Sequence, residues 1–273
     1  MSTSKFNIAV LIDGDNAQAK LIKEIIEEVS IYGKATIRRI YGDWTTPVMN
    51  SWKEKINQYS INPIQKFSYT SGKNSTDSSL IIDAMDILYA GNIDGFCIVS
   101  SDSDYTGLAK RIREEGLFVM GIGKSTTPIA FVNSCEIFTF TENLTTEEKV
   151  ALKEEEVASK KGVKLKKTTS AREKTGKKTV TARQKTDGEK SPPEESPGES
   201  LELDLNLIDR AFKISANEDD QALVSQVGVN LRKIQPSFDA RTYGFKTLTK
   251  LFATLEKYSV IKNEVNGLSQ PIV

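Results

Sequence analysis

Acidic side chains that could hold a metal ion stand at three separate places in the first half of the chain. Asp13 ends the apolar run 7–13, Asp77 follows the polar loop GKNST, and Asp102 and Asp104 follow the run GFCIVSS. Carboxylates gathered in one pocket repel each other, and a divalent cation removes that repulsion. Oxygen ligands in an octahedral arrangement favour Mg²⁺ or Mn²⁺, and such an ion can turn water into a nucleophile that attacks a phosphodiester. The residue types therefore predict metal-dependent hydrolysis, provided that the fold brings the three places together.

Other hydrolytic chemistries are excluded by the composition. The chain contains no histidine, which rules out serine–histidine triads, histidine-ligated zinc hydrolases and the histidine pair of metal-free ribonucleases. Its two cysteines, Cys97 and Cys135, both stand among apolar residues. Two lone cysteines make neither a disulfide scaffold nor a zinc site, so we expect two buried thiols.

The elements that must position the acidic residues follow from the apolar pattern of residues 6–140. Short apolar runs alternate with amphipathic stretches, which predicts an α/β fold with a doubly wound parallel sheet covered on both faces. The first and fourth strands are then neighbours, so Asp13 and Asp102 should converge at the carboxyl edge of the sheet. The expected strands are 7–13, 36–42, 62–68, 95–102, 117–123 and 136–140, and the expected helices are 17–31, 47–59, 77–90, 104–115 and 128–134.

Aspartate is also common in βα turns and at helix N-caps, and that would explain any one of the acidic motifs. Three such motifs at one edge of a parallel sheet favour the metal site. The same reasoning leaves Asp15 as a turn or cap residue. Asp83, inside a helical stretch, is expected to be structural or an outer partner of the site.

The second half of the chain begins with a polar, basic segment, residues 145–202. Within it, residues 159–190 carry 12 Lys and Arg against 3 Asp and Glu. Such a segment cannot bury a core, so we expect a disordered linker whose positive charge attracts polyanions. Helical spacing returns in residues 203–273, where we expect three helices, the third at 245–257. A β-hairpin is expected to follow, and this order is the outline of a winged helix–turn–helix.

No apolar run is long enough to span a membrane, and the opening sequence MSTSKFNIAV lacks the apolar stretch of a signal peptide. We therefore expect a cytoplasmic protein with no membrane contact.

The order of the motifs resembles the NYN domain, LabA-like branch, of the PIN superfamily. The motifs are the DGDN start, IYGDW, GKNSTDSSLIIDAMDIL and IVSSDSDYTGLAKRIREEG, and the similarity runs over roughly residues 5–142. The resemblance implies a PIN-like α/β fold whose aspartates bind Mg²⁺ or Mn²⁺ and cleave RNA.

Carried over position by position, the resemblance assigns the catalytic and metal-binding carboxylates to Asp13, Asp77, Asp102 and Asp104. Asn16 and Ser101 match polar catalytic helpers, and Lys73 matches a basic residue in the loop before the helix. Tyr105 stands where many members have phenylalanine, a difference that we expect to matter little.

Residues 204–273 resemble the OST-HTH, or LOTUS, domain. The phrase VGVNLRKIQPSFDARTYGFKTLTKLFATLEKYSVI carries the likeness, including the Phe-Asp-x-Arg-x-Tyr-Gly turn at residues 238–244. That family is associated with RNA binding and, in some members, with protein partners. The expected RNA-contacting cations of the whole chain are Lys73, Lys124, Arg241, Lys246 and Lys250.

These observations predict three segments: an NYN nuclease domain at 1–144, the linker at 145–202 and a winged-helix domain at 203–273. The expected function is a Mg²⁺- or Mn²⁺-dependent endoribonuclease whose C-terminal module selects single-stranded or structured RNA. Two alternatives remain open. The chain could be a non-catalytic RNA-binding regulator with a weak or empty metal pocket, or a protein-interaction scaffold in which the winged module docks a partner.

Overall fold

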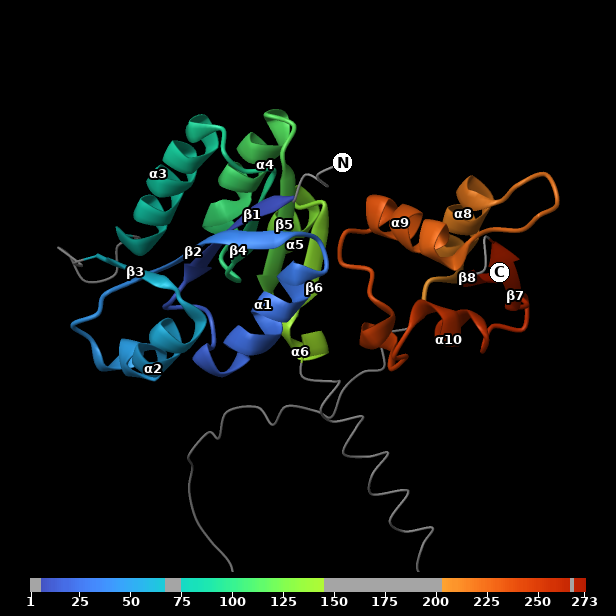
Figure 1. Ribbon diagram of the computed structural model, residues 1–273, viewed down its shortest axis with the longest axis horizontal. Coiled ribbons are helices and arrows are strands. Elements are labelled where there is room, and N and C mark those ends of the chain that lie inside the picture. Colours follow the sequence, from blue (N-terminus) through green and yellow to red (C-terminus); the bar gives the residue numbers. More distant parts are fainter. Residues whose placement is uncertain (1–5, 67–74, 145–202, 266–267) are drawn as a thin grey trace, which may run out of the picture.

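The computed structural model describes residues 6–66, 75–144, 203–265 and 268–273 (Figure 1). They form an α/β unit and a smaller, mainly helical unit. The expected linker and Lys73 lie outside these ranges. Among the described residues, none of the helices combines the length and the apolar character that crossing a bilayer requires.

The first unit is built on a six-stranded parallel sheet, which confirms the expected doubly wound fold. The strand order is β3-β2-β1-β4-β5-β6. The first three strands build the sheet toward one edge, and from β4 on, the strands are added on the other side of β1. This switch point is where functional groups gather in open parallel sheets. The strands are β1 Asn7–Asp13, β2 Lys34–Gly42, β3 Asn62–Gln65, β4 Gly95–Val99, β5 Phe118–Gly123 and β6 Ile137–Phe140.

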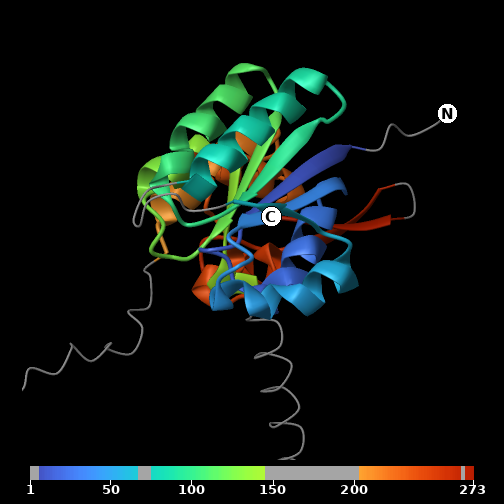
Figure 2. The same cartoon turned by 90° about the vertical axis from the view of Figure 1, so that its left-hand side faces the viewer.

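Helices cover both faces of this sheet (Figures 1 and 2). Successive side chains of a strand point to opposite faces, and β1 shows the result. Leu11 packs in a core with α3, α4 and α5, whereas Val10 packs in a second core with α1 and α2. The helices are α1 Ile22–Ser30, α2 Asn50–Tyr59, α3 Ser75–Ala90, α4 Thr106–Glu114, α5 Ile129–Ser134 and α6 Thr141–Leu144.

The end of β4 differs from the expectation. The strand stops at Val99, not at Asp102, and the following helical stretch opens with a 3₁₀ turn, η3 Ser103–Tyr105. The reason is local capping, because the Asp102 carboxylate accepts a hydrogen bond from the Asp104 backbone N–H at 3.0 Å. Asp102 is thus an N-cap, and its extended backbone does not continue the sheet.

The second unit consists of helices followed by a hairpin. Leu207, Ile208, Val227, Leu231 and Phe252 lie in its core. Its elements are α8 Leu205–Ser215, α9 Val224–Ile234, the 3₁₀ helix η4 Ala240–Tyr243, α10 Leu248–Phe252, β7 Ile261–Val265 and β8 Leu268–Ile272.

The third helix of this unit is shorter than expected, because α10 covers only part of the stretch 245–257. The Thr247 hydroxyl caps its start by accepting from the Lys250 N–H at 3.2 Å. After its end, the N–H groups of Thr254 and Leu255 bond to carbonyls three residues back, so the chain continues in tight turns.

The two units contact each other beside β6 (Figure 1). The N–H of Phe138 on this edge strand donates to the Pro236 carbonyl at 2.9 Å. The Asn143 amide donates to the Thr242 hydroxyl at 2.8 Å. The edge of the sheet is therefore covered by the second unit.

Candidate active site

The switch point brings the ends of β1 and β4 side by side. Ile12 pairs with Val99 in the last described register of the two strands. Asp13 and Ser100 follow directly, and the Ser100 hydroxyl donates to Asp13 Oδ2 at 2.9 Å. The same hydroxyl accepts from the Asp102 N–H at 3.1 Å. One serine thus links the two acidic motifs.

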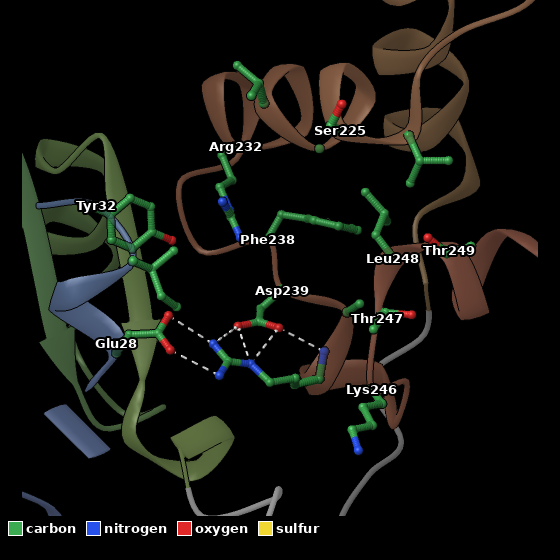
Figure 3. A pocket seen from close by; sticks show the side chains of 16 residues that line it. Glu28, Tyr32, Ser225, Arg232, Phe238, Asp239, Lys246, Thr247, Leu248 and Thr249 are labelled. Atoms are coloured by element: carbon green, nitrogen blue, oxygen red, sulfur yellow. Dashed lines mark hydrogen bonds and ion pairs between the residues drawn. The ribbon is translucent and has the colours of Figure 1, made fainter. Parts of the chain in front are cut away.

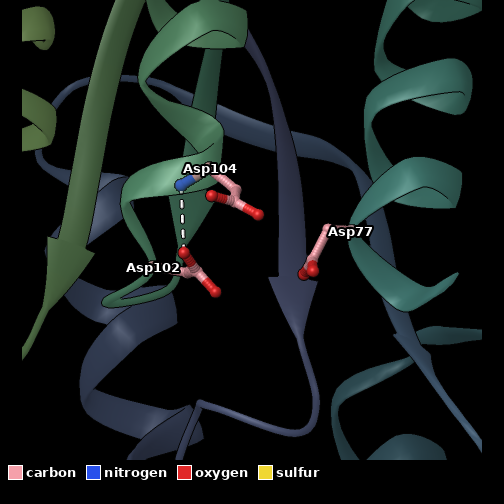
Figure 4. Close-up of side chains that lie close together, drawn as sticks. All are labelled: Asp77, Asp102 and Asp104. Atoms are coloured by element: carbon pink, nitrogen blue, oxygen red, sulfur yellow. Dashed lines mark hydrogen bonds between the residues drawn. The ribbon is translucent and has the colours of Figure 1, made fainter. Parts of the chain in front are cut away.

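Three of the expected carboxylates form a compact group at this edge (Figure 4). Asp77, Asp102 and Asp104 each offer a carboxylate oxygen, and these atoms all lie within 4.8 Å of one another. Asp77 lies in the first turn of α3, whereas the other two belong to the loop and 3₁₀ turn after β4. Residues from two distant parts of the sequence therefore present oxygen atoms to one point.

Asp13, at the end of β1, is outside this group of three and is 1% exposed. Its Oδ2 also accepts from the Asn16 amide at 2.6 Å, and its Oδ1 accepts from the Asp15 N–H at 3.2 Å. Burial raises the pKa of Asp13 above its ordinary value, and the hydrogen bonds from Asn16 and Ser100 offset only part of this effect. The donors therefore hold the carboxylate in one orientation and favour its charged form.

The pKa of Asp77 is affected by burial and by the neighbouring negative charges. Burial raises its pKa, a hydrogen bond from Tyr105 lowers it, and the charges of Asp13, Asp102 and Asp104 raise it again. Such like-charge repulsion is what a bound cation removes.

The Tyr105 hydroxyl donates to Asp77 Oδ1 at 2.7 Å, and the ring is completely buried. No pattern in the sequence assigns this residue to the site, because a phenylalanine would fill the same core position. A phenylalanine would, however, leave Asp77 without this donor. Tyrosine in place of the common phenylalanine therefore supplies a hydrogen bond to an expected metal ligand, whereas we expected this difference to matter little.

Ser100 is a second residue that sequence reasoning missed. The resemblance points to Ser101, whose hydroxyl accepts from the Lys124 N–H at 2.9 Å and so ties the loop after β5 to the loop after β4. Ser100 is the serine that contacts Asp13. Strand alternation from Val99 favours Ser100, but this signal can be used only once the end of β4 is known.

Asp83 lies on α3 outside the acidic group. Its carboxylate accepts from the Arg39 guanidinium and from the Tyr41 hydroxyl, and Tyr41 is fully buried. Burial, followed by the bond to Asp83, raises the pKa of Tyr41. The carboxylate thus joins α3 to β2 and has a structural role.

The expected RNA-contacting cations are spread over the molecule. Lys124 is exposed just after β5, and Lys246 and Lys250 are exposed on the second unit. Arg241 is different, because its guanidinium binds Glu28 of α1 and Asp239 at once. It joins the two units.

Two family models match the chain. The NYN domain model matches residues 7–144, and the OST-HTH/LOTUS domain model matches residues 206–269. Among solved structures, a protein of unknown function from Vibrio parahaemolyticus RIMD 2210633 is 18% identical, with a TM-score of 0.43; the match covers 50% of this chain and 94% of that chain. A comparison with curated proteins gives no match.

Proposed function

Because the chain belongs to the NYN family, part of the PIN-like nuclease superfamily, we propose that it is a Mg²⁺- or Mn²⁺-dependent endoribonuclease. One observation carries the proposal: the oxygen atoms of Asp77, Asp102 and Asp104 lie within 4.8 Å of one another. They lie at the sheet edge where α/β folds bind their ligands.

The donor set fits a hard divalent cation. All three groups offer carboxylate oxygen, the ligand that Mg²⁺ and Mn²⁺ prefer. Burial and, after it, repulsion from Asp13, Asp102 and Asp104 raise the pKa of Asp77, and a bound cation would relieve that repulsion. Asp77, Asp102 and Asp104 are the proposed ligands, and Asp13 adds a fourth negative charge near Asp77.

A bound ion would supply an activated water molecule and neutralise charge on the phosphodiester. The protein's own contribution is to fix the carboxylates before RNA arrives. The Asp104 N–H orients Asp102, Tyr105 orients Asp77, and Ser100 orients Asp13. Such outer partners are part of a metal site, because they set the direction of each ligand.

RNA as the substrate is supported by the second domain. OST-HTH/LOTUS domains are associated with RNA binding, so the C-terminal domain is proposed to select the RNA that the NYN domain cuts.

The test is an RNA cleavage assay with the full-length chain and a mixture of fluorescein-labelled RNAs, with Mn²⁺, Mg²⁺ or EDTA. Asp102→Asn removes a proposed metal ligand. Cleavage should therefore fall by at least about 10- to 100-fold, which is the usual cost of losing an outer partner of a metal site. The matched control is Asp86→Asn, an exposed aspartate on α3. Activity that survives EDTA, or equal activity of the two variants, would contradict the proposal.

A further inference from the structure

Two neighbouring open cavities lie along the contact between the two domains. The first has a volume of about 720 Å³ and lies between the end of α1 and α9 (Figure 3). The second, of about 600 Å³, lies between the start of β5 and the end of α9. Tyr32, Val229 and Arg232 line both. Together the cavities follow the domain contact, here named the seam.

Arg241 fixes the geometry of the seam. Its guanidinium donates to both Glu28 oxygens at 3.0 Å and to Asp239 at 2.7 Å. The Arg241 and Glu28 side chains are 16% and 5% exposed, so water competes little with the pair. Paired, bidentate bonds of this kind are directional as well as strong.

The same arginine changes the charge that a ligand would meet. Glu28 and Asp239 both line the first cavity and would repel an anion. Arg241 binds both carboxylates and offsets one of their two negative charges within the wall of the cavity.

Positive side chains still outnumber negative ones in the lining of both cavities. Arg232 and Lys246 line the first cavity, and Arg113, Arg232 and Lys233 line the second, where Glu136 is the acidic residue. Within the described parts of the chain, Arg232, Lys233 and Lys246 form no ion pair with a carboxylate. Arg113 donates to the backbone carbonyls of residues 133 and 134.

Exposed apolar and aromatic side chains stand between these cations. Ile31 and Val229 are 70% and 47% exposed on the wall of the first cavity. The Tyr32 ring carries the Arg232 guanidinium 5.9 Å from its centroid and stacks on Phe118 at 5.8 Å. Alternating cations and flat or apolar surfaces suit single-stranded nucleic acid, whose phosphates and unstacked bases are both accessible.

We propose that the seam binds a single-stranded segment of the RNA substrate, with phosphates on Arg232, Lys246 and Lys233 and bases against the apolar wall. The proposal rests on the ribonuclease function and extends it, because the seam is lined by α1, β5 and the OST-HTH domain and not by the acidic group on η3 and α3. Cavities of this size accept a ligand of about one or two nucleotides, not a duplex. Arg241 is a positioning residue here, since its own donors are already bound.

The test measures binding of a short, fluorescein-labelled oligouridine by anisotropy, in EDTA, with the full-length chain carrying Asp102→Asn. In this background, Arg232→Gln with Lys246→Gln should weaken binding about tenfold, and the salt slope should fall by about 1.4, the value for two lost contacts to a single strand. Arg210→Gln with Lys213→Gln removes the same charge from exposed positions of α8, away from both cavities, and should leave affinity and slope unchanged.

Equal affinities of the two double variants would overturn the proposal. Equal binding of an RNA duplex, with the same loss in the seam variant, would overturn the single-strand assignment. If the seam variant melts early, Lys233→Gln and Lys246→Gln at exposed positions replace it with the same expectation. Binding is measured here without cleavage, so failure of the seam and failure of the ribonuclease proposal give separate results.

Discussion

The Ser100 hydroxyl joins the two strands that meet at the switch point, because it donates to Asp13 at 2.9 Å and accepts from the Asp102 N–H at 3.1 Å. Ser100 is 2% exposed, so water does not replace it easily. It orients the Asp13 carboxylate and holds the backbone of Asp102 in place.

Ser100→Ala should therefore lower RNA cleavage by about 10- to 100-fold, the usual cost of losing an outer partner of a metal site. The matched control is Ser101→Ala, because Ser101 contacts the Lys124 backbone and not Asp13. Initial cleavage rates at saturating Mn²⁺ compare the two. A larger effect at Ser101 would mean that the sequence resemblance identified the helper better than the geometry does.

Tyr105→Phe removes only the hydroxyl that orients Asp77. The buried ring stays, so the fold should persist. Losing the donor should weaken metal binding by about 10-fold or more, which appears as a higher Mn²⁺ concentration for half-maximal cleavage. Tyr89→Phe, at an exposed tyrosine of α3, is the control. An unchanged Mn²⁺ requirement in Tyr105→Phe would show that Asp77 needs no such support.

Millimolar Mn²⁺ should raise the melting temperature of the NYN domain, because an ion that binds only the folded state stabilises it by mass action. Each kcal/mol gained should add about 2–4 °C for a chain of this size. Asp102→Asn should respond less, yet without metal it should melt no earlier than the wild type, since one repelling charge is gone. Differential scanning fluorimetry with Asp86→Asn as control measures this. A wild type that does not respond to Mn²⁺ would favour a non-catalytic RNA-binding role.

The sheet could be predicted from the sequence because its central strands are apolar throughout. Ile8 to Ile12 are all 0% exposed, the pattern of a parallel strand buried on both faces. Strand order followed from the alternation of strands and helices. The meeting of the two acidic motifs at one edge could be predicted for the same reason.

The partners of the acidic residues could not be predicted in this way. Whether Ser100 or Ser101 faces Asp13 depends on a shift of one residue at the end of β4, and such a shift reverses every side chain. The partner of Tyr105 lies 28 residues away on α3. Arg241 and Glu28 are 213 residues apart, and neither local spacing nor composition links them.

The Arg241–Glu28 pair should control how firmly the two domains stay together. Glu28→Gln keeps the shape but removes the charge on one side of the contact. Arg241 keeps Asp239 as its partner, so the expected loss is that of charge-assisted hydrogen bonds, about 1.5–3 kcal/mol. Spin labels on Lys20→Cys and Lys213→Cys, both exposed, report the distance between the domains.

This measurement is practical because Cys97 and Cys135 are buried, and burial raises the pKa of Cys135 to about 12, so both native thiols should stay unlabelled. The distance distribution should broaden in Glu28→Gln. It should stay narrow in Glu27→Gln, whose exposed carboxylate pairs with Lys23 on the surface of the same helix. Equal distributions in the two variants would show that Arg241 does not control docking.

The basic segment 145–200 and the C-terminal domain should contribute to RNA binding in different ways. Residues 159–190 carry a net charge of +9 and no aromatic residue, so they can attract phosphates but cannot stack on bases. Deleting 145–200 should weaken RNA binding at low salt and flatten its salt dependence. Removing 201–273 should reduce discrimination between RNAs and leave the NYN domain able to cut. Affinities for several RNAs across a salt series, measured for both truncations, test this division. If the linker deletion keeps the full salt slope, its lysines do not touch RNA and the segment is only a tether.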